Sequence, residues 1–121
     1  MRGFYFLVFL FSVQSFADDI NNYRYYQKWQ AFPNAKERGA IYIKVNDPCI
    51  VVENKENASK KRYCQMFPSQ LNLENDYPTI YPTEINFDGA NLFFYVAAPW
   101  SEQKCSIDLP NEEIKCSPTG N

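Results

Sequence analysis

Histidine is absent from this chain of 121 residues, and glycine occurs only four times. Without histidine, the chain has no Ser–His or Cys–His nucleophile, no histidine general base and no histidine metal ligand. None of the glycines belongs to a loop that could cradle a phosphate. The net charge of −2 also lacks the strongly basic balance expected of a domain that binds nucleic acid.

Other catalytic patterns are missing as well. Ser101 has no histidine partner, and the Asp-x-Asp-x-Asp-Gly pattern of a calcium loop does not occur. Two carboxylates alone can support hydrolysis of a glycoside, and Asp108, Glu112 and Glu113 are the acids considered for such a role. Because they fall in an expected surface turn, we interpret them as exposed acids that aid solubility. We expect no catalytic residue, no metal site and no cofactor.

The N-terminal segment has the three parts of a secretory signal peptide. Arg2 supplies a positive start, residues 4–13 are apolar except for one serine, and residues 15–17 place small side chains at the −3 and −1 positions of a cleavage site. The apolar run is about half of the ~20 residues that a membrane-spanning helix needs. We therefore expect residues 1–17 to be cleaved, and residues 18–121 to form one domain in the periplasm or outside the cell, with no membrane segment left.

Retention of the apolar segment is the alternative for the N-terminus. Gly3 followed by Phe4 and an apolar run resembles the cleavage site of a prepilin, in which that run is kept as a helix. The fifth residue after such a cut is Val8 rather than a glutamate, and the apolar run ends early. Both features favour the cleaved signal peptide.

Four cysteines in an exported chain indicate disulfides, and four cysteines allow three connectivities. Folding residues 105–116 about their centre sets Cys105 opposite Cys116 and Ile107 opposite Ile114. Period-two alternation then places all four side chains on one face of a hairpin. This match predicts a Cys105–Cys116 disulfide.

The first two cysteines give a similar match. Folding residues 49–64 about their centre sets Cys49 opposite Cys64, Ile50 opposite Tyr63, and a glutamate opposite a lysine. We therefore predict a Cys49–Cys64 disulfide as well. No Cys-x-x-Cys spacing indicates redox chemistry, so both disulfides are interpreted as structural.

The coarse secondary structure begins with an expected helix over residues 18–32. Two aspartates favour its start, Pro33 ends it, and Tyr25, Trp29 and Phe32 recur at helical spacing, as on a helix that packs against a core. From residue 40 onward the pattern has period two. Strands are expected over residues 40–45, in the two disulfide hairpins, and on either side of an Asp-Gly turn at 88–89.

That last hairpin is expected to pair Ile85 with Leu92 across a type I′ turn. The element order predicts an α+β domain, an antiparallel meander of about seven short strands with one N-terminal helix. An all-β barrel or sandwich with a peripheral helix is the alternative.

Residues 68–83 stand apart because they contain three prolines and the near-repeat Tyr-Pro-Thr at 77–79 and 81–83. Proline stiffens the chain, and a stiff loop that carries tyrosine loses little freedom on binding. Tyr77, Tyr81 and the nearby Trp100 are therefore the predicted partner-binding residues, since Tyr and Trp are enriched in binding hot spots. The alternative is that both tyrosines simply cover the sheet.

Charge is distributed unevenly along the chain. Residues 24–62 hold nine basic and four acidic side chains, a balance of +5, whereas residues 63–121 hold two basic and eight acidic ones, a balance of −6. If the two halves form different surfaces, the acidic surface would steer a cationic partner.

Three functions follow from these observations. The favoured one is a non-catalytic exported protein-binding module, such as an inhibitor or immunity protein of a secreted enzyme, whose partner is another protein. The alternative is a structural or assembly component of a surface apparatus, such as a pilus-like fibre or a secretion system. The third is a small exported hydrolase that uses carboxylates alone.

Overall fold

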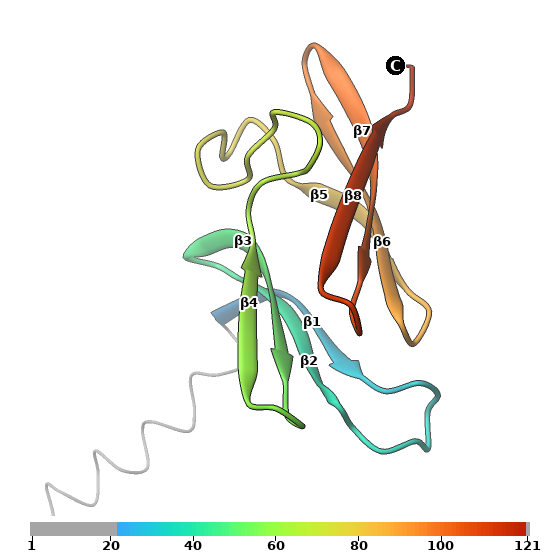
Figure 1. Ribbon diagram of the computed structural model, residues 1–121. Helices are drawn as coiled ribbons and strands as arrows, with labels where there is room; N and C mark the ends of the chain where they lie inside the picture. Colours follow the sequence, from blue (N-terminus) through green and yellow to red (C-terminus); the bar gives the residue numbers. More distant parts are fainter. Residues whose placement is uncertain (1–21, 121) are drawn as a thin grey trace, which may run out of the picture.

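The computed structural model describes residues 22–120, which form eight antiparallel strands in two sheets (Figure 1). Sheet 1 has the order β1-β2-β3-β4, and sheet 2 has the order β5-β6-β7-β8. The strands of sheet 1 are β1 (Tyr23–Trp29), β2 (Gly39–Lys44), β3 (Asp47–Asn54) and β4 (Ser59–Tyr63). The strands of sheet 2 are β5 (Pro82–Phe87), β6 (Asn91–Ala98), β7 (Ser101–Asp108) and β8 (Glu113–Pro118). The described residues contain no helix with the length and apolar character needed to cross a bilayer.

The predicted N-terminal helix is wrong where the structure describes it, because β1 occupies its second half and pairs with β2. The expected α+β class is therefore corrected to two antiparallel sheets, with no helix in residues 22–120. Tyr25 and Trp29 are four residues apart, a spacing that shares a face in a helix and also in a strand. Phe32, which only a helix would bring to that face, is 64% exposed. The predicted signal peptide and residues 18–21 lie outside the described residues.

Both predicted disulfides are confirmed. Cys49 is bonded to Cys64 and Cys105 to Cys116, at sequence separations of 15 and 11. The expected registers are also present, with Ile50 opposite Tyr63 and Ile107 opposite Ile114. Such short-range disulfides are compatible with an oxidising environment.

The predicted hairpin around residues 88–89 is present, but its register is shifted. Leu92 lies opposite Phe87 rather than Ile85, so four residues connect the strands instead of two. The reason is Asp88, whose carboxylate accepts hydrogen bonds from two backbone N–H groups of the loop at 2.9 and 2.6 Å. An aspartate that caps its own turn in this way stabilises a longer loop than the type I′ turn.

One apolar core lies between the two sheets and is completed by the linker, residues 64–81 (Figure 1). Sheet 1 and sheet 2 both contribute side chains to this core, and the linker adds Met66, Leu71, Leu73 and Ile80. The largest fully buried side chains are Trp29, Phe94, Ile41, Ile50, Met66, Leu73, Ile80, Leu92, Ile107 and Leu109. Because the core is shared, separating the two sheets would expose the buried side chains of both.

The neighbouring phenylalanines of β6 offer a matched test of this core. Phe94 is 1% exposed and Phe93 is 39% exposed, on opposite faces of the strand. We expect Phe94→Ala to lower the free energy of unfolding by about 3–5 kcal/mol, because it removes a buried ring and leaves a cavity. Phe93→Ala should cost less than about 1 kcal/mol. Urea denaturation of both variants measures the difference, and equal losses would contradict the assigned faces.

Gly89 allows a second stability test. Its φ is +101°, and a Cβ atom there would lie 2.6 Å from the carbonyl oxygen of Ala31 in the loop after β1. We expect Gly89→Ala to lower the free energy of unfolding by more than about 1 kcal/mol. Gly120 is the control, since its φ is +94° but nothing lies within 4 Å of the built Cβ. If thermal denaturation shows the same loss for Gly120→Ala, the contact with Ala31 contributes nothing.

Candidate binding site

The edges of the two sheets approach each other on two sides of the molecule. On one side β4 lies near β8, and on the other β1 lies near β5. The two sides differ in the space left between the sheets. On the side of β4 and β8, the Lys61 ammonium donates a hydrogen bond to the backbone oxygen of Glu112 at 3.0 Å. On the same side, the backbone N–H of Cys116 donates to the carbonyl oxygen of Phe67 at 2.7 Å. The cavity left beside Trp29 and Tyr63 is about 10 Å³. That volume holds at most about one water molecule, so this side is closed.

The opposite side, between the edge strands β1 and β5, is open. Two hollows lie along it, one of about 180 Å³ and one of about 530 Å³. The smaller hollow, which we call the tyrosine hollow, is lined by Arg24, Tyr25, Ile43, Pro48, Tyr77, Tyr81, Pro82 and Ile85. The larger one, the distal hollow, is lined by Gln27, Lys28, Gln30, Ala31, Phe32, Pro33, Phe87, Asp88 and Gly89. Residues from the β1 and β5 regions thus line both ends of the open side.

Two of the three predicted binding residues meet in the tyrosine hollow. Tyr77 is half-buried, and Tyr81 is 55% exposed. The Arg24 guanidinium lies 4.9 Å from the centre of the Tyr77 ring, within the range of a cation–π contact. Burial raises the pKa of the neighbouring Tyr25 hydroxyl, which therefore stays protonated at neutral pH.

The position of Arg24 depends on an irregularity in β1. The register of β1 against β2 shifts between Tyr23 and Tyr25, so Arg24 is the extra residue of a bulge. A bulge re-aims the side chain of its extra residue, and here that side chain lines the tyrosine hollow. Sequence reasoning missed Arg24 because it placed this residue in a helix and because no local pattern marks such a bulge.

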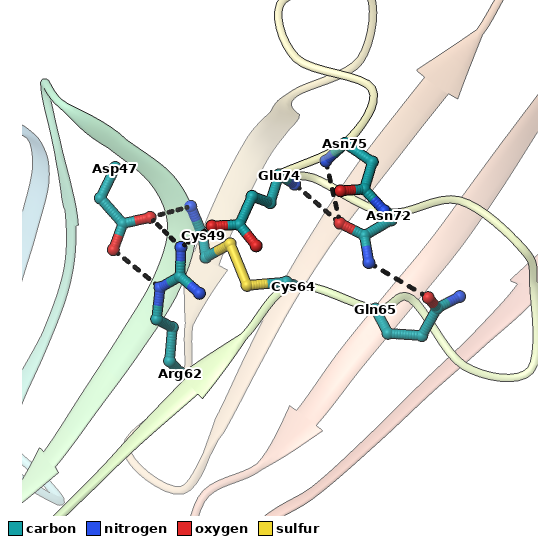
Figure 2. Close-up of a disulfide and its surroundings, with 8 residues drawn as sticks. All are labelled: Asp47, Cys49, Arg62, Cys64, Gln65, Asn72, Glu74 and Asn75. Carbon is teal, nitrogen blue, oxygen red and sulfur yellow. Dashed lines mark hydrogen bonds and ion pairs between the residues drawn. A yellow bond between two sulfur atoms is a disulfide. The ribbon is translucent and has the colours of Figure 1, made fainter.

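The linker that carries both tyrosines is anchored at its start by a disulfide and an ion-pair cluster (Figure 2). The Arg62 guanidinium donates to both carboxylate oxygens of Asp47, each at 2.9 Å, and to the Glu74 carboxylate at 2.6 Å. Asp47 also accepts a hydrogen bond from the backbone N–H of Cys49. Arg62 therefore joins β3, β4 and the linker at the point where Cys64 is bonded to Cys49.

Hydrogen bonds within the linker fold it back on itself (Figure 2). Asn72 donates from its amide to Gln65 at 3.2 Å, and its side-chain oxygen accepts from the backbone N–H groups of Glu74 and Asn75 at 2.9 and 3.1 Å. The backbone N–H of Asn72 donates in turn to the carboxylate of Asp76 at 3.0 Å. The linker is consequently a compact loop held by its own hydrogen bonds.

Trp100, the third predicted binding residue, lies apart from the tyrosine hollow. It occupies the turn between β6 and β7 and is 69% exposed. The pairing of Pro82 with Val96 places this turn and the start of β5 at the same end of sheet 2. Trp100 is thus near the end of the open side without lining the hollow.

A second aromatic cluster lies on sheet 1 but leaves no hollow. Tyr23 and Tyr42 contact edge to face at 5.2 Å, and Tyr26 stacks with Tyr42 at 6.2 Å between ring centres. The Tyr42 hydroxyl donates to the Glu53 carboxylate, and burial together with this hydrogen bond raises the pKa of that hydroxyl. The polar group of Tyr42 is therefore already paired within the protein.

The acids considered for hydrolysis lie in and beside the turn between β7 and β8. Asp108 accepts hydrogen bonds from the backbone and side chain of Asn111 at 3.3 and 2.8 Å, so it organises the turn. Glu112 and Glu113 are exposed in the same hairpin. Within residues 22–120, no group of three or more Cys, Asp or Glu side chains is placed to hold a metal ion.

The two differently charged halves of the sequence form different sheets. The basic stretch 24–62 covers sheet 1 and its turns, and the acidic remainder covers the linker and sheet 2. Four of the sheet 1 cations pair with acids, namely Arg38 with Glu56, Lys55 with Glu37, Lys60 with Glu53, and Arg62 with Asp47 and Glu74. Arg24 and Lys28 are among the cations that form no such pair within residues 22–120.

The Arg62 cluster predicts a pH dependence of stability. The hydrogen bonds from Arg62 hold the pKa of the Asp47 carboxyl below its usual range. A lowered pKa contributes stability above the unfolded-state value of about 4, and this contribution disappears as the pH falls through the lower folded-state pKa. Because the Arg62 side chain is 42% exposed, we expect Asp47→Asn to cost less than about 1 kcal/mol at pH 7.

Urea denaturation at pH 7 and at pH 2 checks this expectation. The cost of Asp47→Asn should be present at pH 7 and should shrink toward pH 2, as the pH falls through the lowered folded-state pKa. An equal cost at both pH values would show that the effect does not come from the charge of the Asp47 carboxylate.

No protein-family model, curated protein or solved structure matches this chain. Because no relative supplies functional residues, the role of the open side has to follow from its own geometry and charge.

Proposed function

We propose that this protein is a non-catalytic exported module that binds another protein through the tyrosine hollow. Its most concrete form is an inhibitor or immunity protein of a secreted enzyme. The observation that carries the proposal is the meeting of Tyr77, Tyr81 and Arg24 around one hollow on the open side. Tyr and Arg are two of the three residue types enriched in hot spots of protein interfaces.

The size of the hollow supports a protein partner over a small-molecule ligand. Sites for small molecules occupy roughly 300–1,000 Å³, whereas the tyrosine hollow measures about 180 Å³. A volume of that size suits a single side chain inserted from a partner. The anchored linker adds a further advantage, because a preordered loop loses little conformational entropy on binding.

Export of the protein is supported by two features. The N-terminal 17 residues have the pattern of a signal peptide, and the two disulfides are compatible with an oxidising compartment. An exported inhibitor or immunity protein would meet its enzyme in that compartment.

Variants of the exposed aromatic residues test the proposal. The immobilised protein is incubated with culture fluid and envelope extract of its source, and the retained partner is identified and titrated. We expect Tyr77→Ala with Tyr81→Ala to weaken binding by about tenfold or more, because loss of a hot spot costs about 2 kcal/mol or more. Phe93→Ala, which removes an exposed ring of sheet 2, is the matched control and should leave the affinity unchanged.

The Trp100→Ala variant tests whether the third predicted residue contributes to binding independently of the tyrosine hollow. A loss of binding in this variant alone would move the contact surface to the turn between β6 and β7. Full binding by the variant lacking both tyrosines, with an unchanged unfolding transition, would refute the tyrosine hollow as the contact site.

A further inference from the structure

Resting on the proposed function, we infer that the partner presents an extended acidic segment that pairs with the free edge of β1. In this arrangement a carboxylate of the segment contacts Arg24, and an apolar side chain two residues away, on the same face of the segment, enters the tyrosine hollow. The inference combines three properties of the open side: its charge, the shape of its hollow and the regularity of one strand edge.

Charge is the first property. Of the three arginines in residues 22–120, Arg38 and Arg62 form ion pairs with acids of that part of the chain, whereas Arg24 forms none with them. Among the described residues, Arg24 is also the only charged one that lines the tyrosine hollow. A guanidinium that lies against a ring and has no acidic partner binds a carboxylate through two parallel hydrogen bonds.

The wall of the hollow is the second property. Apart from Arg24, it consists of aromatic, aliphatic and proline side chains, among them Tyr25, Ile43 and Ile85. A lone carboxylate would leave this wall in contact with water. An apolar side chain two residues from the acid lies on the same face of an extended segment and would cover this wall, so the segment should combine both residue types.

The edge of β1 is the third property. Residues 25–29 pair with β2 in continuous register, so the other edge of β1 offers a regular row of five residues. At about 3.4 Å per residue, this row spans roughly 17 Å along the open side. Extended peptides commonly bind by adding a strand to such an edge.

The facing edge, β5, is much less suited to an added strand. It begins with Pro82, which has no N–H to donate, and its register shifts between Thr83 and Asn86, where Glu84 has a φ of +50°. The edge of β4 lies on the closed side, where Lys61 contacts the turn between β7 and β8. Among the strands that border the two sides, β1 is therefore the one with a free and regular edge.

The charges on β1 favour an acidic segment over a second copy of this chain. Arg24 lies just before the regular row and lines the tyrosine hollow, and Lys28 lies within the row and lines the distal hollow. Lys28 also forms no ion pair within residues 22–120. Two copies paired through β1 would bring these cations close to their counterparts, which is destabilising. An acidic segment converts the same cations into attractive contacts.

Three synthetic peptides test the inference. Each is an acetylated ten-residue amide that alternates threonine and valine, with the valines at its fourth and sixth positions replaced by glutamate, glutamine or lysine, so that the replaced residues share a face with the remaining valines. Nuclear magnetic resonance of the ¹⁵N-labelled full chain gives the affinity and the amides that each peptide perturbs. We expect the glutamate peptide to perturb and protect amides of residues 24–29, and to bind about tenfold or more tightly than the glutamine peptide.

Charge reversal supplies the matched variants. Arg24→Glu should abolish the preference for the glutamate peptide and favour the lysine peptide, and Arg24→Gln should remove the preference without reversing it. Lys36→Glu is the control, because Lys36 is exposed in the loop after β1 and lines neither hollow. It should leave the preference intact.

The outcomes separate this inference from the proposed function. Equal binding of all three peptides, lost on removal of Tyr77 and Tyr81, would overturn the acidic segment and keep the hollow as a binding site. Perturbation confined to β5 or sheet 1's outer face would overturn pairing with β1. Absence of binding by every peptide at millimolar concentration would also overturn the inference, while capture of the partner would still test the proposed function independently.

Discussion

The Cys49–Cys64 disulfide is the constraint on which the rest of the molecule depends. It fixes the point at which the chain leaves sheet 1, and Arg62 reinforces that point through Asp47 and Glu74. The linker that starts there closes one end of the core with four buried side chains and then delivers the chain to β5. The position of sheet 2 and the position of the two tyrosines are therefore set by the same local anchor.

From that anchor follows the difference between the two sides of the molecule. The start of the linker lies against β8, where Phe67 accepts a backbone hydrogen bond from Cys116, and so helps to close that side. The end of the linker lies across from β1, where Tyr77 meets Arg24. The hydrogen bond between Cys116 and Phe67 pairs backbone polar groups and helps to close the side of β4 and β8. On the side of β1 and β5, aromatic rings line a hollow that remains accessible.

The parts of the fold that sequence predicts correctly are those determined by neighbours along the chain. Both disulfides could be found because each closes a single hairpin whose opposed residues match in chemistry, as Ile107 matches Ile114. The Asp-Gly signal located a hairpin correctly but not its register, because the Asp88 carboxylate caps a longer loop than the type I′ turn that this dipeptide indicates. The prediction of an N-terminal helix was wrong because aromatic residues four positions apart share a face in a strand as well as in a helix.

The sequence predicted only part of the tyrosine hollow. Tyr77 and Tyr81 could be singled out because prolines and repeated tyrosines mark an unusual segment. Their meeting with Arg24 could not, because more than fifty residues separate them and the contact depends on a bulge in β1. Trp100 shows the converse, since its residue type suggested a role together with the two tyrosines, whereas it does not line their hollow.

Every strand in either sheet pairs only with strands adjacent to it in sequence. Little chain entropy is lost in closing such short loops, so each four-stranded unit can assemble from one contiguous stretch of polypeptide. Each thiol also meets its correct partner before it meets a thiol of the other pair. A chain that emerges from a channel N-terminus first could therefore complete its first crosslink while the second half is still in transit, with no mispaired species to rearrange.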